Sequence, residues 1–257
     1  GFAILVSQWF GAKQYDRMRH YVAMSVYLAL GFALLMTIGF GFANEPILRL
    51  MNYSDQIMPD VKAYMGIIYA GLIVTAAYNS LAAFLLGDSK SPLYFLIISA
   101  VINVALDVAF IIFGGMGVEG CAYATVIAQG ISAVLCLIYI IKKFPILHLK
   151  KEDFKISLSA WGRLLALGIP MALQFSITAI GTIIVQGAIN VYGENAMAGF
   201  SAASKLQNII MTVFVAFGAT IATYVGQNRG AGKMDRVRQG VRCTQFMIWG
   251  YSIFAMV

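Results

Sequence analysis

Asp107 has the clearest chemical potential in this chain, because it is the one acidic side chain deep within an apolar segment. In a membrane helix a charge at that depth costs about 3 kcal/mol, and such residues usually serve ion or proton pathways. Asn103 lies four residues earlier and so shares a helical face with Asp107. Carboxylate and amide oxygens suit Na⁺, and a buried carboxyl equally suits H⁺. The alternative is a neutral Asp107 that only bonds neighbouring helices.

Polar residues in two neighbouring apolar segments could complete such a site. Thr125 lies about as far into its segment as Asp107 lies from the end of its own, so we expect the two at one depth. Asn79 lies one turn after Thr75 in an earlier segment, but by residue count it is nearer the opposite side. Gln129 follows Thr125 by one turn.

Two further segments carry polar residues at three- or four-residue spacing. One explanation is hydrogen-bonding between helices, which is common in membrane bundles. The other is the wall of a substrate passage, and the pattern leaves both open. The stripes are Gln174, Thr178, Thr182, Gln186 and Asn190 in the first segment, and Ser201, Lys205, Asn208 and Thr212 in the second.

Familiar catalytic patterns are absent or misplaced, so we do not expect an enzyme. Residues 115–120 fit the dinucleotide pattern GxGxxG but lie in a short turn with no βαβ unit around it. Residues 226–233 resemble a phosphate loop, but the spacing is one residue too long and Met234 stands where Ser or Thr would hold magnesium. No cofactor is expected beyond a coupling ion, H⁺ or Na⁺, with Na⁺ at Asp107 as the one metal considered.

The composition requires these residues to sit in a membrane. Of 257 residues, 60% are apolar and 11% are charged, which is less than half the charged share of soluble domains. Mean hydropathy is +0.81, which also excludes a disordered chain. The three cysteines are scattered and odd in number, which excludes a disulfide-stapled domain. We therefore predict an all-α, polytopic helical membrane protein.

Six segments are long and apolar enough to span a bilayer. The chain starts and stops inside further apolar runs at 1–12 and 241–257, so we expect a fragment of a longer protein. Pro170 should kink the fifth segment, because it lacks a backbone donor. The six segments are 21–43, 61–86, 92–113, 118–141, 164–191 and 196–225.

Basic residues predict which side each loop faces. Connections on one face carry 15 of the 18 lysines and arginines, the other face carries Arg49 and Lys62, and Lys205 lies within a span. This asymmetry predicts that the basic loops are cytoplasmic and that the protein resides in the plasma (inner) membrane. Since the charge is divided among loops between spans, we do not expect nucleic-acid binding.

An internal repeat predicts the architecture of the whole protein. Residues 6–19 resemble residues 225–238, with seven identities in fourteen positions at an offset of 219. Both copies end an apolar segment and begin a basic loop, and six spans lie between them. This implies two parallel six-helix repeats and about twelve helices in all. We expect residues 1–141 in the first lobe, 142–163 as the loop between lobes, and 164–257 at the start of the second.

The chain resembles the multidrug and toxic compound extrusion (MATE) family of secondary transporters over its whole length. Together the matching pieces are specific, although no single one would be. They are Gln8 with Gly11-Ala12, residues 87–92, residues 103–107, residues 117–120 with Ala124-Thr125, residues 168–170, and residues 225–228 with 230–233.

The resemblance implies two six-helix lobes that export cationic, amphipathic small molecules in exchange for H⁺ or Na⁺. It implies a coupling cluster of Asp107, Asn103, Asn79 and Thr125, with Gln174, Thr178, Gln186, Lys205 and Asn208 as candidates along the substrate passage. Span 164–191 has no acidic residue, which places coupling on Asp107. Expected partners are a small-molecule substrate, cationic in this family, and membrane lipid, with the protein a monomer.

Two rival functions remain. A lipid-linked precursor flippase of the same superfamily would be expected to show a strongly basic cleft, whereas only Lys205 is basic within a span. A channel would pass ions without coupling them to a substrate.

Overall fold

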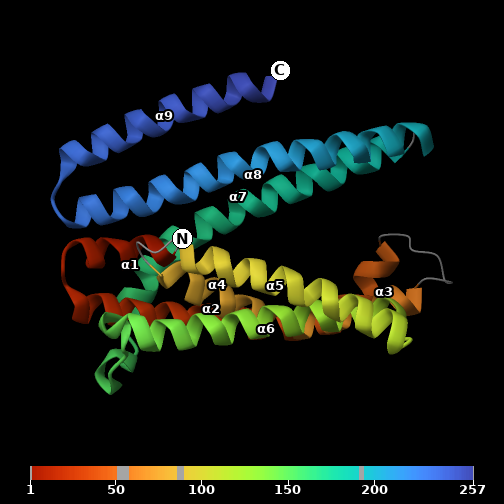
Figure 1. Ribbon diagram of the computed structural model, residues 1–257, viewed down its shortest axis with the longest axis horizontal. Coiled ribbons are helices and arrows are strands. Elements are labelled where there is room, and N and C mark those ends of the chain that lie inside the picture. The colour runs from red at the N-terminus through yellow and green to blue at the C-terminus, as the bar shows by residue number, and fades with distance from the viewer. Residues whose placement is uncertain (1, 51–57, 86–89, 191–193, 257) are drawn as a thin grey trace. The chain divides into compact units, whose positions relative to one another are not determined.

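The computed structural model describes residues 2–50, 58–85, 90–190 and 194–256, which contain helices and no strands (Figure 1). The all-α prediction is confirmed. The helices are α1 (Phe2–Gly11), α2 (Tyr15–Leu50), α3 (Met58–Ala70), α4 (Leu72–Phe84), α5 (Lys90–Val108), the π-helical turn η1 (Ala109–Phe113), α6 (Gly117–Lys143), the short 3-10 turns η2 (Pro145–Leu147) and η3 (Lys151–Phe154), α7 (Leu158–Asn190), α8 (Glu194–Gly230) and α9 (Met234–Met256).

The number of spans agrees with the prediction, but one span has a different shape. Among the described residues, five helices are long and apolar enough to cross a membrane, and α3 with α4 makes a sixth if the pair is one span. The span predicted at 61–86 corresponds to α3 with α4, and the chain bends by 42° between these two helices, which the sequence did not indicate. The break falls at Gly71, where a Cβ would lie 2.4 Å from Val126 Cγ2 of α6. The missing side chain lets the bend approach α6 closely.

Helices α2, α7 and α8 extend beyond the apolar segments predicted for them. Helix α2 begins at Tyr15 and ends at Leu50, whereas hydropathy marks only 21–43. Polar residues at its ends continue the same backbone hydrogen bonding, which hydropathy does not register. Pro170 lies inside α7 without ending it, and the predicted kink there stays a prediction.

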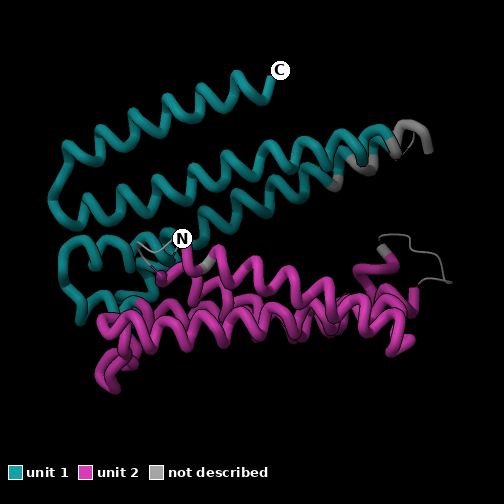
Figure 2. The backbone as a smooth tube through the Cα atoms, viewed as in Figure 1, with its two compact units in different colours: residues 1–21, 157–257 teal, residues 22–156 magenta. Residues whose placement is uncertain are grey.

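The described chain divides into two compact units (Figure 2). One unit holds residues 1–21 and 157–257, in which α1 packs against α8 and α8 against α9. The other holds residues 22–156, in which α6 packs against α3, α4 and α5. The predicted lobe boundaries at 141 and 163 concern the whole transporter and stay a prediction.

The internal repeat reappears in the backbone of two loops, α1–α2 and α8–α9. Lys13 and Gly232, which correspond at the offset of 219, both have positive φ, at 58° and 70°. The amide hydrogen bonds around them correspond one for one. In the first loop Ala12 donates to Gln8, Lys13 to Phe10 and Gln14 to Trp9, and in the second Ala231 donates to Gln227, Gly232 to Arg229 and Lys233 to Asn228, all at 2.9–3.1 Å.

The two repeat copies also pack against each other where α1 crosses α8. A Cβ on Gly11 would lie 1.9 Å from the backbone oxygen of Gln227, and a Cβ on Gly230 would lie 1.9 Å from the backbone oxygen of Gln8. Gln8 corresponds to Gln227 and Gly11 to Gly230, so the contact is reciprocal. The crossing therefore has local two-fold symmetry.

Small residues spaced four apart permit this close approach. Gly226 faces Ser7, with which it corresponds, and a Cβ on Gly226 would lie 2.2 Å from Ser7 Oγ. Ser7 with Gly11 and Gly226 with Gly230 thus form two small-xxx-small pairs, the arrangement that lets membrane helices approach backbone to backbone.

Opposite substitutions at the two matched loop positions should have opposite effects on stability. Lys13→Gly should raise the free energy of unfolding by about 0.5–1 kcal/mol, because Lys13 is exposed and glycine adopts positive φ without strain. Gly232→Ala should lower it by about 1 kcal/mol, since no atom lies within 4 Å of that Cβ and only φ is penalised. Thermal denaturation in detergent would measure both, and shifts of the same sign would contradict the correspondence.

Candidate functional site

The polar cluster predicted around Asp107 is partly assembled between α5 and α6. Asn103 Nδ2 of α5 donates to Thr125 Oγ1 of α6 at 3.4 Å, and the Thr125 hydroxyl donates to the backbone oxygen of Cys121 at 2.9 Å. Both side chains are half-buried. The two helices therefore present an amide and a hydroxyl to each other, but the residue that meets Thr125 is Asn103 and not Asp107, whose depth Thr125 was expected to match.

A second polar contact joins α4 to α6 one turn further along. Thr75 Oγ1 donates to Gln129 Oε1 and is also 3.3 Å from the backbone oxygen of Gly71. Gly71 is the residue at which the span bends, and it packs against Val126, the residue after Thr125. The bend thus brings Thr75 to α6 beside the Asn103–Thr125 pair.

Asp107 lies one turn beyond Asn103 on α5 and is half-buried. Its Oδ1 is shielded from solvent and has no hydrogen-bond partner among the described residues. A buried carboxylate oxygen without a partner is unfavourable when ionised. A proton or a cation on this carboxyl would remove that cost, which is the chemistry that coupling requires.

A π-helical turn, η1, begins two residues after Asp107. It ends at Phe113, and the chain reverses through Gly115 and Gly117, both with positive φ. Helix α6 then begins so close that a Cβ on Gly120 would lie 2.9 Å from Phe110 Cβ. The turn between the helices is therefore residues 114–116, whereas residues 117–120, which were expected in the same turn, form the first turn of α6. Sequence reasoning missed η1, although π turns often occur at functional sites.

Asn79 is not joined to this cluster. Its side chain is exposed on α4, and it makes no hydrogen bond among the described residues. Thr75, one turn earlier on the same helix, makes the contact to α6 instead. The role of Asn79 in coupling, which rests on the family resemblance, stays a prediction.

The candidate passage residues on α7 and α8 are exposed where their side chains are described. Gln174, Thr178, Lys205 and Asn208 all belong to this group. The hydroxyls bond to their own helix: Thr178 Oγ1 donates to the backbone oxygen of Gln174 at 2.9 Å. The stripes therefore do not act as hydrogen-bond links between helices in the described part of the chain. The side chain of Gln186 and residues 87–89 of the matching motif lie outside the described residues.

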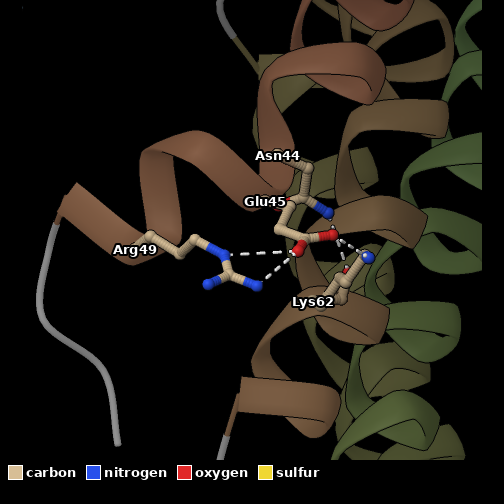
Figure 3. A network of polar contacts seen from close by, with 4 residues as sticks. All are labelled: Asn44, Glu45, Arg49 and Lys62. Carbon is tan, nitrogen blue, oxygen red and sulfur yellow. Dashed lines mark hydrogen bonds and ion pairs between the residues drawn. The ribbon is translucent and has the colours of Figure 1, made fainter. Parts of the chain in front are cut away.

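A separate polar network ties the end of α2 to the start of α3 (Figure 3). Glu45 accepts hydrogen bonds from Arg49 Nη2 at 2.8 Å and from Lys62 Nζ at 2.7 Å, while Asn44 Nδ2 donates to the backbone oxygen of Lys62 at 3.0 Å. Arg49 and Lys62 are the two basic residues on the face predicted to be poor in positive charge. Because Glu45 binds both, that face carries even less free positive charge than the residue count suggests.

The described helices define a polytopic α-helical membrane protein. The chain belongs to the MatE family, whose profile matches residues 1–109 and 166–257. This confirms the resemblance to multidrug and toxic compound extrusion transporters.

Individual relatives agree with this assignment. The chain is 33% identical to the probable multidrug resistance protein YpnP of Bacillus subtilis, and this match covers 91% of the present chain. It is 25% identical to a FAD transporter of Shewanella oneidensis, and that match covers 77% of the present chain. The fold matches the outward-facing structure of a multidrug resistance MATE family transporter with a TM-score of 0.90 at 19% identity, over 98% of this chain and 57% of that one. The chain spans about half the length of the curated relatives it matches.

Proposed function

We propose that this chain is part of a secondary active transporter that exports cationic or amphipathic small molecules in exchange for H⁺ or Na⁺. The observation that carries the proposal is the buried, unpartnered Oδ1 of Asp107 beside the Asn103–Thr125 pair. Family membership and the multidrug resistance relative support the same function rather than catalysis.

In the proposed mechanism, the Asp107 carboxyl alternates between a charged form and a form that is neutralised by a bound proton or Na⁺. Protonation or Na⁺ binding neutralises the carboxyl and favours the arrangement of α4, α5 and α6 in which it is buried. Release of the ion restores the charge and favours an arrangement in which water reaches the site. An ion can shift this equilibrium only through different affinities for the two arrangements, and Asp107 is where that difference would arise.

The proposed orientation places the basic loops in the cytoplasm of the cell. The loops that follow α1 and α8 are basic, whereas Arg49 and Lys62 on the other face are neutralised in part by Glu45. This supports the positive-inside assignment and export from the side of the basic loops. Insertion in the plasma membrane and a monomeric state complete the proposal.

Lipid-linked precursor transport is the second candidate, and the charges on α7 and α8 disfavour it. Lys205 is the basic residue within the predicted span of α8, and the described passage positions on α7 are uncharged. At these passage positions a polyanionic precursor would find Lys205 as the single basic partner for its phosphates. The relative named as a FAD transporter makes an anionic dinucleotide a further substrate class to include in the test.

Uptake into inside-out vesicles carrying the full-length protein tests the function. We expect a fluorescent cationic dye to accumulate when an H⁺ or Na⁺ gradient is imposed, and the effective gradient identifies the ion. FAD serves as the anionic alternative. Uptake should saturate with dye and reverse when the gradient is reversed, whereas a channel would do neither. Dye accumulation that is the same with and without an imposed H⁺ or Na⁺ gradient would contradict the proposal.

A further inference from the structure

A cavity of about 610 Å³ opens within the unit formed by residues 1–21 and 157–257. It lies where α1 ends, α7 begins and α8 ends. Its polar lining comes from Gln8, Trp9 and Gln14 near the α1–α2 loop, Arg163 on α7 and Arg229 on α8. No side chain that the proposed coupling site uses lies in this lining. The lining therefore shares no residue with the Asp107 cluster.

The cavity carries uncompensated positive charge. Arg163 and Arg229 are exposed, and neither forms an ion pair with an acidic side chain in the part of the chain that the structure describes. No acidic residue is in the described lining. The guanidinium of Arg17 adds to the same field, because it lies 5.0 Å from the centre of the Trp9 ring, which lines the cavity. An anion in the cavity would be attracted by these arginines and would meet no carboxylate in the described lining.

The donors suit a phosphate group. Guanidinium groups bind phosphate oxygens through paired, charge-assisted hydrogen bonds. The amide groups of Gln8 and Gln14 add neutral donors. Asp and Glu would accept rather than donate, and the lining contains neither.

The rest of the cavity lining is apolar, and this indicates which kind of phosphate compound the cavity would bind. Leu5 and Leu167 line the cavity on the side of the apolar helix bodies, and the arginines lie toward the basic loops. A site with arginines at the polar end and leucines beside the hydrocarbon region matches a phospholipid at the bilayer surface. Basic pockets between membrane helices on the cytoplasmic side bind anionic headgroups in this way.

We propose that this cavity binds a phosphate-bearing anion, with the headgroup of an anionic phospholipid as its source. Bound there, the lipid would bridge α1, α7 and α8 at the ends of the crossing helices. This proposal does not depend on the transported substrate or on the coupling ion.

Lipid binding to the purified full-length protein tests the site. Native mass spectrometry would follow titration with phosphatidylglycerol, with phosphatidylcholine as the neutral lipid. We expect phosphatidylglycerol to bind more tightly, and the double variant Arg163→Gln/Arg229→Gln to weaken its binding by roughly 10- to 30-fold. The variant Arg163→Lys/Arg229→Lys keeps the charge but loses the paired guanidinium hydrogen bonds, so its affinity should lie between that of the wild type and that of the Gln double variant.

A matched control removes the same charge elsewhere. Arg238→Gln/Arg242→Gln changes two exposed arginines on α9 that do not line the cavity and should leave binding unchanged. Inorganic phosphate added in excess identifies the source: displacement of phosphatidylglycerol would support a phosphate site open to soluble anions, and no displacement would support a lipid site. The proposal is wrong if the Gln double variant binds phosphatidylglycerol as tightly as the wild type does. It is also wrong if the α9 control variant loses as much affinity for phosphatidylglycerol as the Gln double variant.

Discussion

Asp107→Asn should reduce ion-driven transport to background while raising the thermal stability of the protein. The substitution keeps the shape of the side chain but removes the group that can be protonated or bind a cation. The carboxyl oxygen that it alters is buried and unpaired among the described residues. An uncharged amide costs less there than a carboxylate, so the folded state should gain about 1 kcal/mol or more.

Two readouts on one variant separate coupling from structure. Gradient-driven dye uptake in vesicles measures coupling, and thermal denaturation of the purified protein measures stability. Glu119→Gln is the matched control, because it removes a carboxylate from the first turn of α6 outside the cluster and should transport normally. If Asp107→Asn transports normally, Asp107 is structural and the coupling group lies elsewhere in the transporter. A fall in stability would contradict the account of the unpaired oxygen.

Gly230→Ala should be among the most damaging small substitutions in this chain. The added methyl would lie 1.9 Å from the backbone oxygen of Gln8 and 3.1 Å from the backbone nitrogen of Ala12. Backbone atoms cannot rotate away as a side chain can, so α1 and α8 would have to separate. We expect a loss of about 3 kcal/mol or more and a marked fall in the yield of folded protein.

Gly218→Ala on the same helix is the matched control. No atom lies within 4 Å of a Cβ at Gly218, so this substitution should be neutral or stabilising by up to about 1 kcal/mol. Gly11→Ala places a methyl 1.9 Å from the backbone oxygen of Gln227 and should match Gly230→Ala in its effect. Thermal denaturation and size-exclusion profiles would compare the three. Equal stability of Gly230→Ala and Gly218→Ala would refute the close crossing.

The parts of the site that sequence predicted well are those that depend on residue spacing within one regular helix. Asn103 and Asp107 share a face of α5 because they are four residues apart, although Thr125 of α6 meets Asn103 rather than Asp107. The repeat at residues 6–19 and 225–238 could also be found from the sequence, because identical residues at matched positions can be recognised without knowing how the helices pack.

The parts that sequence reasoning missed depend on departures from a regular helix. Hydropathy over 61–86 gives no sign of the bend at Gly71, since a glycine in an apolar segment is compatible with a straight helix too. The π turn at Ala109–Phe113 consists of apolar residues with no distinguishing pattern. Residue count placed Asn79 nearer the opposite side, but the contact between Thr75 and Gln129 of α6 depends on this bend and was not predicted.

The reciprocal crossing of α1 and α8 has a consequence for the ancestry of the chain. A contact in which Gly11 meets Gln227 while Gly230 meets Gln8 is isologous, the kind that two identical subunits make across a dimer axis. Such an interface is what a gene duplication leaves behind when it fuses the partners of a symmetric dimer. At the matched positions Lys13 and Gly232, both copies keep the left-handed backbone, which glycine adopts without strain and lysine at a cost.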